Sequence, residues 1–465
     1  MRARNSNISI SPYGGVLPIL KNLKESGIPQ LIRSELGKRK EQATYGYDDI
    51  LIAWTITALC GGKRLEHISR YRKPLEVIRG LKLPSHDTLG RVMKKLATET
   101  ITKEVISPCR GKYKINNNYV NDNLKMNRML IKATKRLGAL KEGITYTLHI
   151  DATFVKTLCV GSNLSPEKIT HGFNPMVCSI GDLIVFVSMR NGDSNSKFQI
   201  KECLEQCLEI LEENNIKIGK VISDGAGYDK AVIDMLDKRG VKFTIHAPTN
   251  QNYKKMRKQL DENTNWKQTV IETAWEFKYC EIGEIEYKMV GGVKPYRLIA
   301  ARMPKDGTGI KKNKSVEKIM TELEKKKKLK SYNDKYPLGK WKILGKHKVK
   351  LIITNDYFKS PEEIVKEYNK RGAAEKEFDY MKNDFGWKLP PFQKMNENAV
   401  FFIASALANN VMRAMVMKFK KVIPELRLEA RLYDFVFSFV IVCVSYINKQ
   451  YVFYDAQFDY VKLLV

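Results

Sequence analysis

The spacing of hydrophobic residues predicts helices in the first part of the chain, followed by alternating strands and helices. In residues 1 to about 140, hydrophobic positions recur at helical spacing in LPILKNLKESGIPQLIRSEL and in DDILIAWTITALCGG. Ser85 or Asp87 can cap a further helix, which carries several basic residues. This pattern predicts a helical N-terminal domain, and its basic faces suit either DNA binding or a supporting, dimerising role.

From about residue 144 the predicted elements follow the order three strands, helix, strand, helix, strand. The three strands are ITYTLHIDATFVKTLCV, NPMVCSI and LIVFVSMR, and Gly181-Asp182 forms the turn between the last two. KFQIKECLEQCLEILEENN predicts an amphipathic helix, which is followed by strand KIGKVISD, helix YDKAVIDMLDKRG and strand VKFTIHA. This order is typical of the ribonuclease H-like fold, so we predict an α/β protein whose mixed-sheet catalytic core begins with residues 141–247.

Residues 248–345 interrupt that order. They contain Trp266, Trp275 and two strand-like segments, and a Lys-rich tract gives residues 301–350 a total of 17 Lys and Arg against 5 Asp and Glu. We interpret the segment as a basic, β-rich insertion that clamps DNA. Exposed, solvated loops are the alternative interpretation.

The core resumes after the insertion, in residues 346–420. Strand HKVKLIITN comes first, and Ser360-Pro361 marks the start of a helix. Residues 421–465 form a C-terminal region of mixed strand and helix character. Its longest hydrophobic run, Phe435 to Ile447, has 13 residues and is too short to span a bilayer.

Charge and cysteine content indicate the kind of partner and the compartment. The 465 residues carry a formal net charge of +30 and have a pI near 9.6, which favours a polyanion such as nucleic acid as the partner. The eight cysteines form no Cys-x-x-Cys pair, and the N-terminus lacks the hydrophobic stretch of a signal peptide. We therefore expect a reduced, cytoplasmic protein that does not enter a membrane.

Candidate chemistry begins with YNKRGAAEKEFDYMK, which has the composition of a helix interior. At 100° per residue, four of its side chains fall within about 60° of one another: Tyr368, Arg371, Glu375 and Lys382. One stripe would thus hold an aromatic ring, two cations and a carboxylate, which suits a metal ion beside a phosphate chain. The alternative is a surface helix on which Arg371 and Glu375 merely pair at i, i+4.

Two further carboxylates occur where a divalent-metal site could form. Asp151 falls within the first core strand among hydrophobic residues, where an unsatisfied carboxylate would be costly. Asp224 follows the apolar strand VIS at its carboxyl end, a position where an Asp is often only a turn or cap residue. Asp229 and Asp182 are the nearest competing acids. Together with Glu375, these residues offer three oxygen ligands for two Mg²⁺ ions, which suits phosphodiester cleavage and transfer.

These residues resemble the DDE transposases of bacterial insertion sequences, specifically the IS-four-like group and its thirteen-eighty family. The Tyr-x2-Arg-x3-Glu-x6-Lys signature of that group is complete at Tyr368, Arg371, Glu375 and Lys382. The resemblance runs from about residue 15 to 420 and includes LHIDAT, ISDGAGYD, YRLIAAR around Arg297, SPEEIV and ALANN. One departure is the additional glycine after the second Asp, in the stretch Asp224-Gly225-Ala226-Gly227-Tyr228.

The resemblance implies a catalytic, metal-binding triad of Asp151, Asp224 and Glu375 in the ribonuclease H-like core. It implies two Mg²⁺ ions as the cofactor, with Mn²⁺ as a substitute. The implied partner is double-stranded DNA, as terminal inverted repeats and as target. The predicted DNA contacts are Tyr368, Arg371, Lys382, Arg190, Arg297 and Trp266.

A transposase of this kind would act as a homodimer on DNA, in the bacterial cytoplasm at the nucleoid. Water would cut the element ends, a DNA hairpin would form there, and the 3′-hydroxyl ends would be joined to target DNA. An extruded base can stack on Trp266 or Trp275, although both residues could equally be core anchors of the insertion. The alternatives are a plain metal-dependent nuclease of the same fold and a DNA-binding protein that has lost catalysis.

Overall fold

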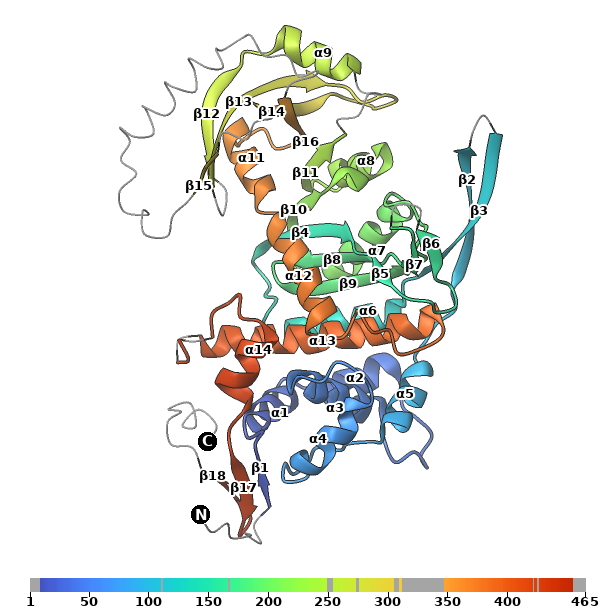
Figure 1. Ribbon diagram of the computed structural model, residues 1–465, viewed down its shortest axis with the longest axis vertical. Coiled ribbons are helices and arrows are strands. Elements are labelled where there is room, and N and C mark those ends of the chain that lie inside the picture. Colours follow the sequence, from blue (N-terminus) through green and yellow to red (C-terminus); the bar gives the residue numbers. More distant parts are fainter. Residues whose placement is uncertain are drawn as a thin grey trace.

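A 12-stranded mixed sheet runs through the computed structural model, and five strands in its middle form the core (Figure 1). The structure describes residues 9–454, except 110–111, 166–167, 249–253, 273–275, 305–308, 312–346, 421 and 425. The core strands lie in the order β9-β8-β4-β10-β11. Their bounds are β4 (Thr145–Ala152), β8 (Met176–Ile180), β9 (Leu183–Arg190), β10 (Lys217–Ser223) and β11 (Lys242–Ala247).

The directions of the core strands agree with the predicted order of elements. β4 pairs in parallel with β10, and β10 with β11, whereas β8 is antiparallel to both β4 and β9. The β8–β9 hairpin turns at Gly181, whose φ of 55° is a conformation that glycine adopts without strain. Helices α7 (Ile200–Glu213) and α8 (Lys230–Lys238) supply the connections between β9, β10 and β11. The protein is therefore mixed α/β, with the strand arrangement expected of a ribonuclease H-like core.

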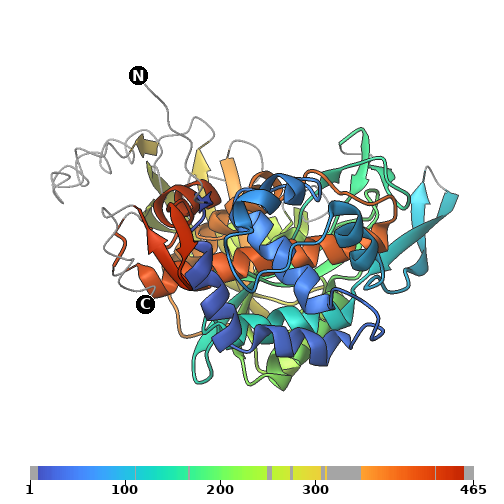
Figure 2. The ribbon, with the colours of Figure 1, turned by 90° about the horizontal axis from the view of Figure 1, so that it is seen from below.

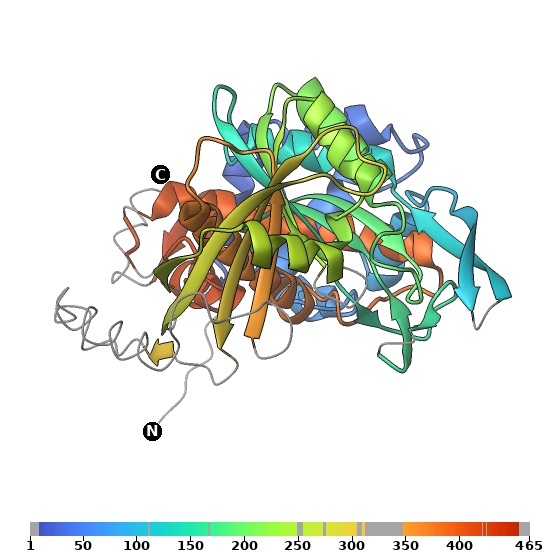
Figure 3. The same cartoon turned by 90° about the horizontal axis from the view of Figure 1, so that it is seen from above.

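Residues 101–121 correct the expectation that the chain is mainly helical up to residue 140. They form the antiparallel hairpin of β2 (Ile101–Cys109) and β3 (Lys112–Asn121), which projects from the body of the molecule (Figures 1 and 3). Only its base joins the large sheet, where Val120 and Asn121 pair with β9. The segment is rich in β-branched residues, a strand signal that the helical interpretation of the region overlooked.

The N-terminal helices lie on one side of the long helix α13 (Met395–Phe419), and the sheet lies on the other (Figures 1 and 2). Trp54 donates its indole N–H to Ser405 Oγ at 3.2 Å and so links the two layers. α13 is hydrophobic and long enough to cross a membrane, but 94% of its most hydrophobic window is buried inside the fold. The helices of this layer are α1 (Val16–Glu25), α2 (Ile28–Leu36), α3 (Tyr47–Leu59), α4 (His67–Leu75) and α5 (His86–Lys94), whereas α6 (Leu124–Arg136) packs against α2, α13 and strand β9.

Strands from residues 248–345 continue the core sheet instead of forming a separate one. Beyond β11 the sheet runs through β16, β14, β13 and β12, and α9 (Lys254–Asn263) packs against β13 (Figure 3). Most of the Lys-rich tract lies outside the described residues, so its DNA-clamping role stays a prediction. The strands are β12 (Lys267–Glu272), β13 (Glu276–Tyr287), β14 (Tyr296–Pro304), β15 (Gly309–Lys311) and β16 (His347–Thr354).

The stretch predicted as one helix from Tyr368 to Lys382 spans two helices. α11 (Pro361–Asn369) begins at Ser360 with a capping box, as the sequence predicts. α12 (Gly372–Asn383) follows after a turn that contains Arg371. Glycine has a low helix propensity, and its place at this junction suits the interruption. The expected stripe is therefore not continuous, because Tyr368 ends one helix and Arg371 precedes the next.

Two small three-stranded sheets flank these layers. One brings the two ends of the described chain together in the order β1-β17-β18, next to α14 (Leu432–Phe435) and a π-helical turn at Val436–Val440. The other, β5-β7-β6, comes from the chain between β4 and β8. The strands are β1 (Ile10–Ser11), β17 (Val444–Ile447), β18 (Gln450–Phe453), β5 (Val155–Lys156), β6 (Asn163–Ser165) and β7 (Thr170–Phe173).

Candidate active site

Two carboxylates meet at one edge of the core sheet. Asp151 lies near the end of β4, and Asp224 directly follows β10. Because β4 and β10 are parallel, with Ile150 opposite Ser223, the carboxyl ends of the two strands lie side by side. Both acids line one cavity of about 660 Å³. Neighbouring rigid strands thus hold the two carboxylates at one space.

The competing acids lie in other settings. Asp229 caps the N-terminus of α8. Asp182 lies in the β8–β9 turn, 3.9 Å from the guanidinium of Arg413. Asp224 caps a single 3-10 turn, Gly225–Gly227, and still lines the cavity. The additional glycine after Asp224 is therefore compatible with the predicted position of the second acid.

Two predicted cations face the same cavity. Arg371 and Lys382 line it from the two ends of α12. The Arg371 guanidinium donates a hydrogen bond to Asp151 Oδ2, while Asp151 Oδ1 accepts the backbone N–H of Ala152 at 2.8 Å. An internal cation thus neutralises part of the charge of Asp151.

Burial dominates the electrostatics of Asp151. It raises the pKa of this carboxyl to about 6; the positive charge of Arg371 opposes the rise, and the negative charge of Asp224 adds to it. One guanidinium is thus insufficient to stabilise the ionised acid pair, and a further cation at the two carboxylates would be favourable.

The surroundings of Lys382 disfavour its positive charge. Burial lowers the pKa of its ammonium group, and Lys388 and Lys168 also lower it, against the attraction of Asp379 and Asp151. An anion placed beside Lys382 would relieve this unfavourable environment. The cavity therefore combines carboxylates that favour a cation with ammonium groups that favour an anion.

Tyr368 is only 7% exposed and does not line the cavity. Its ring stacks on His246, with the ring centroids 6.1 Å apart. Burial raises the pKa of the Tyr368 hydroxyl to about 12, although Arg371 acts against the rise. The hydroxyl therefore remains a protonated donor.

Glu375 belongs to α12, between Arg371 and Lys382. Its side chain lies outside the described part of the structure, so its position in the cavity stays a prediction. Within the described residues, no three His, Cys, Asp or Glu side chains form a metal-binding cluster. The oxygen donors of Asp151 and Asp224 fit a hard divalent cation. Glu375 stays the predicted third ligand, and Asp379 is the α12 carboxylate that the structure places in the cavity lining.

An ionic network, which we call the Lys220 network, is centred on two buried residues, Lys220 and Asp356. Lys220 of β10 donates to Asp356 Oδ2 and to Glu367 Oε2, each at 2.8 Å. Lys242 donates to Asp356 Oδ1 at 3.0 Å, and Lys359 donates to Glu367 Oε2 at 2.9 Å. The network ties α11, which carries Glu367, to the strand that precedes the second catalytic candidate.

The family of this chain follows from its sequence similarity to a known family. The sequence matches the family described as transposase DDE domain group 1 over residues 1–338. The chain belongs to this family. The matched part includes Asp151 and Asp224 and ends before Glu375.

Two solved structures are similar to this transposase. One is a cryo-EM structure of the piggyBac transposase synaptic complex with hairpin DNA, at 10% identity and a TM-score of 0.43, over 93% of this chain and 80% of that chain. The other is the Drosophila P element transposase strand transfer complex, at 13% identity and a TM-score of 0.23, over 55% of this chain and 52% of that one. No curated protein matches the chain.

The structure contradicts two of the DNA contacts predicted for the transposase. Arg190 is fully buried and donates to the backbone carbonyls of Asn174, Ser196 and Phe198. Arg297 is 9% exposed and holds Glu284 and the carbonyls of Asp356 and Lys359. Both guanidiniums bind internal acceptors, which basic residue type alone does not reveal.

Trp266 of the inserted segment packs against a cation. Trp266 is partly buried, and the guanidinium of Arg302 lies 3.8 Å from the centre of its ring. Arg302 in turn pairs with buried Glu281 at 2.6 Å. This packing supports the anchor role that the sequence left open for Trp266 and speaks against a base-stacking role. Trp275 lies outside the described residues.

Several residues that line the transposase cavity were not predicted. They come from the loop after β4, the small β5-β7-β6 sheet, the loop after β9 and α12. The sequence contains no motif that singles them out, because separate turns bring them together. They are Thr153, Phe154, Ser165, Lys168, Asn174, Ser196, Phe378 and Asp379.

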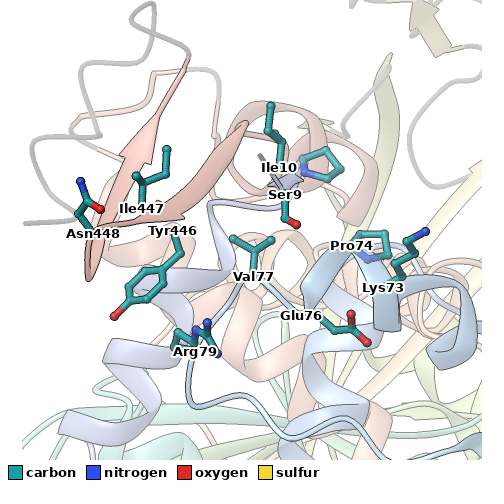
Figure 4. A pocket seen from close by; sticks show the side chains of 11 residues that line it. Ser9, Ile10, Lys73, Pro74, Glu76, Val77, Arg79, Tyr446, Ile447 and Asn448 are labelled. Carbon is teal, nitrogen blue, oxygen red and sulfur yellow. The ribbon is translucent and has the colours of Figure 1, made fainter. Parts of the chain in front are cut away.

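Another cavity, of about 770 Å³, lies far from the catalytic candidates in sequence and between other elements (Figure 4). It is formed by the chain around β1, the end of α4 and the β17–β18 turn. Arg79 lies over the ring of Tyr446, 5.1 Å from its centroid, and Glu76 is the acid in its lining. Among the described residues of its lining, Glu76 is the single acid, so they do not supply the paired carboxylates of a two-metal site.

Proposed function

We propose that this transposase is a Mg²⁺-dependent enzyme of a bacterial insertion sequence, in the IS-four-like group and its thirteen-eighty family. It would bind the terminal inverted repeats of its element, cut the element ends and join the 3′-hydroxyl ends to target DNA. One observation carries the proposal: Asp151 and Asp224 end adjacent parallel strands and share a cavity with Arg371 and Lys382. The net charge of +30 suits a DNA substrate.

The residues of the cavity divide the work between metal and phosphate. Asp151, Asp224 and Glu375 would hold two Mg²⁺ ions, with Mn²⁺ as a substitute. When bound, the ions would activate the attacking oxygen and stabilise the leaving oxygen. Arg371 can grip a phosphate with two donors and Lys382 offers a point charge. Both would orient the phosphodiester so that water can attack the phosphorus in line.

The resemblance of the Tyr-Arg-Glu-Lys signature to that of the thirteen-eighty family supports the remaining steps of the reaction. The freed 3′-hydroxyl would attack a phosphodiester of the opposite strand, which closes a hairpin at the element end and releases the flanking DNA. Water would then open the hairpin and free the 3′-hydroxyl again, and this hydroxyl would attack a phosphodiester of the target DNA. We propose a homodimer on DNA, since two ends must be cut in step, and action at the nucleoid in the bacterial cytoplasm. The reaction products distinguish this function from its two alternatives, a nuclease of the same fold and a DNA-binding protein that has lost catalysis.

The test uses purified protein and a labelled duplex that carries an end of its own element, with Mg²⁺ or with chelator, read on a denaturing gel. Nicks that require metal, together with a slow-running hairpin confined to the element end, are expected. Cleavage without strand transfer to a target plasmid would favour the nuclease. Binding without any cut would favour the silent DNA-binding protein.

Replacing Arg371 with Gln should strengthen metal binding although it weakens DNA cleavage. Arg371 and a divalent cation compete for Asp151, so removal of the guanidinium should raise Mn²⁺ affinity on the order of tenfold without DNA. Isothermal titration at pH 8, where Asp151 is ionised, measures the change. Asp151→Asn serves as the control that should lose metal binding; unchanged affinity in Arg371→Gln would refute the competition.

Replacing Lys382 with Ala should weaken duplex binding more at low salt than at high salt. One phosphate contact contributes about one unit to the slope of log affinity against log salt concentration, so the slope should fall by about 1. Fluorescence anisotropy at ~50 mM and at ~200 mM salt measures this slope. A loss of affinity that does not depend on salt would count against the phosphate role.

A further inference from the structure

The turn between β6 and β7 carries an isoleucine in an unfavourable conformation. Ile169 has a φ of 52°, and its backbone N–H donates to the carbonyl of Ser165 at 2.9 Å. A β-branched residue at positive φ is rare, because its branched Cβ crowds the backbone. The Ile169 side chain is also 84% exposed, so no burial within the fold offsets the strain. Such a combination points to a role outside the folded core.

The residue before Ile169 faces the catalytic candidates. Lys168 lines the same cavity as Asp151, Asp224 and Lys382. Its positive charge helps to lower the pKa of the Lys382 ammonium group. Among the described residues, none forms an ion pair or a hydrogen bond with the Lys168 ammonium group. Lys168 and Lys382 share the cavity with three carboxylates, those of Asp151, Asp224 and Asp379. Where metal ions take up the carboxylates, the two ammonium groups suit a phosphate as their partner.

The turn rests on a fixed support. The β5-β7-β6 sheet joins the edge of the core through the pairing of Phe173 with Asn191. Gly172 of β7 lies against Phe154 and the carbonyl of Val155, where a Cβ atom would come within 2.4 Å of both. This close approach fixes the small sheet beside the cavity. The positions of Lys168 and Ile169 are therefore set by packed neighbours.

Hydrophobic side chains near the turn indicate which ligand the cations serve. Leu164, opposite His171 in the small sheet whose strand β7 follows Ile169, is 52% exposed. A free anion would gain nothing from this surface. A nucleotide presents a phosphate together with the apolar faces of a sugar and a base, and so matches both kinds of side chain.

We propose that Lys168 and Ile169 form a DNA subsite in which Lys168 binds a phosphate next to the one that is cut, while Ile169 packs on the adjoining nucleotide. This inference rests on the proposed function, since it requires that the cavity cuts DNA. It adds two residues to the DNA contacts, from a turn that lies outside the Tyr-Arg-Glu-Lys signature.

Ile169→Gly separates the subsite from a purely structural role. Glycine adopts positive φ freely, so the variant should be at least as stable as the wild type, with an unchanged or higher melting temperature. Cleavage of the element end should nevertheless fall by about tenfold, because the apolar contact with the nucleotide is lost. A fall in both melting temperature and activity would assign Ile169 to the fold and overturn its proposed role.

Lys168→Ala should weaken binding to the end duplex and lower the salt slope by about 1, and Lys168→Arg should restore both. Lys156→Ala is the matched control, since Lys156 is an exposed lysine of the same small sheet that does not line the cavity. Equal salt slopes for Lys168→Ala, Lys156→Ala and the wild type would overturn the phosphate contact.

A substrate series tests the nucleotide contact directly. Duplexes with an abasic site at each position beside the cut are cleaved by the wild type and by Ile169→Gly. At one position the abasic site should slow the wild type but not the variant, since both changes remove the same contact. Additive losses at every position would overturn the contact. A wild-type protein that neither binds nor cuts the end would overturn the subsite and the proposed function together, whereas wild-type cleavage with unaffected variants would overturn the subsite alone.

Discussion

Replacing Asp224 with Asn is expected to reduce metal-dependent cleavage by on the order of 10³-fold or more, while duplex binding stays at or above the wild-type level. Asp224 and Asp151 provide the acid pair at the ends of β10 and β4, and an amide is a weaker ligand for Mg²⁺ than a carboxylate. Glu375→Gln should have the same effect if Glu375 is the third ligand. Gel assays of cleavage and anisotropy measurements of binding separate the two properties.

Asp229→Asn is the matched control for this experiment. Asp229 lies five residues after Asp224 in the sequence and caps α8, a position that Asn serves equally well. Cleavage by this variant should remain near the wild-type level. If Asp229→Asn abolished cleavage and Asp224→Asn did not, the second acid would be assigned to the wrong residue.

Asp356→Asn should destabilise the fold by about 3–5 kcal/mol, because it removes one partner from a buried ionic network. Asp356 is fully buried and accepts from Lys220 and Lys242 at 2.8 and 3.0 Å. Without its charge, Lys242 loses its carboxylate partner and Lys220 keeps only Glu367. The free energy of unfolding from urea denaturation measures the loss. Asp87→Asn, at an acid whose side chain is 88% exposed, should change it little and is the control.

The same carboxylate should make stability depend on pH in the acid range. Burial alone would raise the pKa of Asp356, but hydrogen bonds from Lys220 and Lys242 outweigh it and lower the pKa to about 2. The folded state thus binds this proton more weakly than the unfolded state, whose Asp pKa is about 3.9. Its contribution is present above about pH 4 and is lost as pH falls towards 2, by roughly 2 kcal/mol. Asp356→Asn should remove this part of the pH dependence; an unchanged acid transition would contradict the assignment.

The Lys220 network also connects stability to the site. Glu367 immediately precedes Tyr368 in α11, and the helix is held to β10 through Lys220. A disturbed network would shift the turn that carries Arg371 relative to the acid pair. The network therefore positions catalytic candidates without touching a substrate.

Much of the core could be predicted because its signals are local. Apolar periodicity marks β4, β10, α7 and α8, and the Ser360 capping box marks the start of α11. Asp224 could be expected at a strand end because it follows a short apolar run directly. The two acids could be expected to meet, since parallel neighbours place their carboxyl ends at one edge.

The remaining site residues could not be predicted in the same way, because their roles depend on contacts between distant segments. Arg190 and Arg297 have the residue type of DNA contacts, but the folded chain surrounds their guanidiniums with internal acceptors. Lys168 has no sequence motif, and only the small sheet beside the core brings it to the cavity. The turn at Arg371 interrupts a stretch whose composition suits a continuous helix.

The sequence by itself determined the alternation of strands and helices, the positive charge and the identity of the acids, because periodicity, charge and residue type are properties of short segments. Tertiary structure alone decided that β16 joins β11 to β14 and so makes the inserted strands part of the core sheet. It also decided which basic side chains line the cavity and which ones bind acceptors inside the fold. Strand pairing and burial are settled by long-range packing, in which each side chain competes for the partners that the whole fold brings near it.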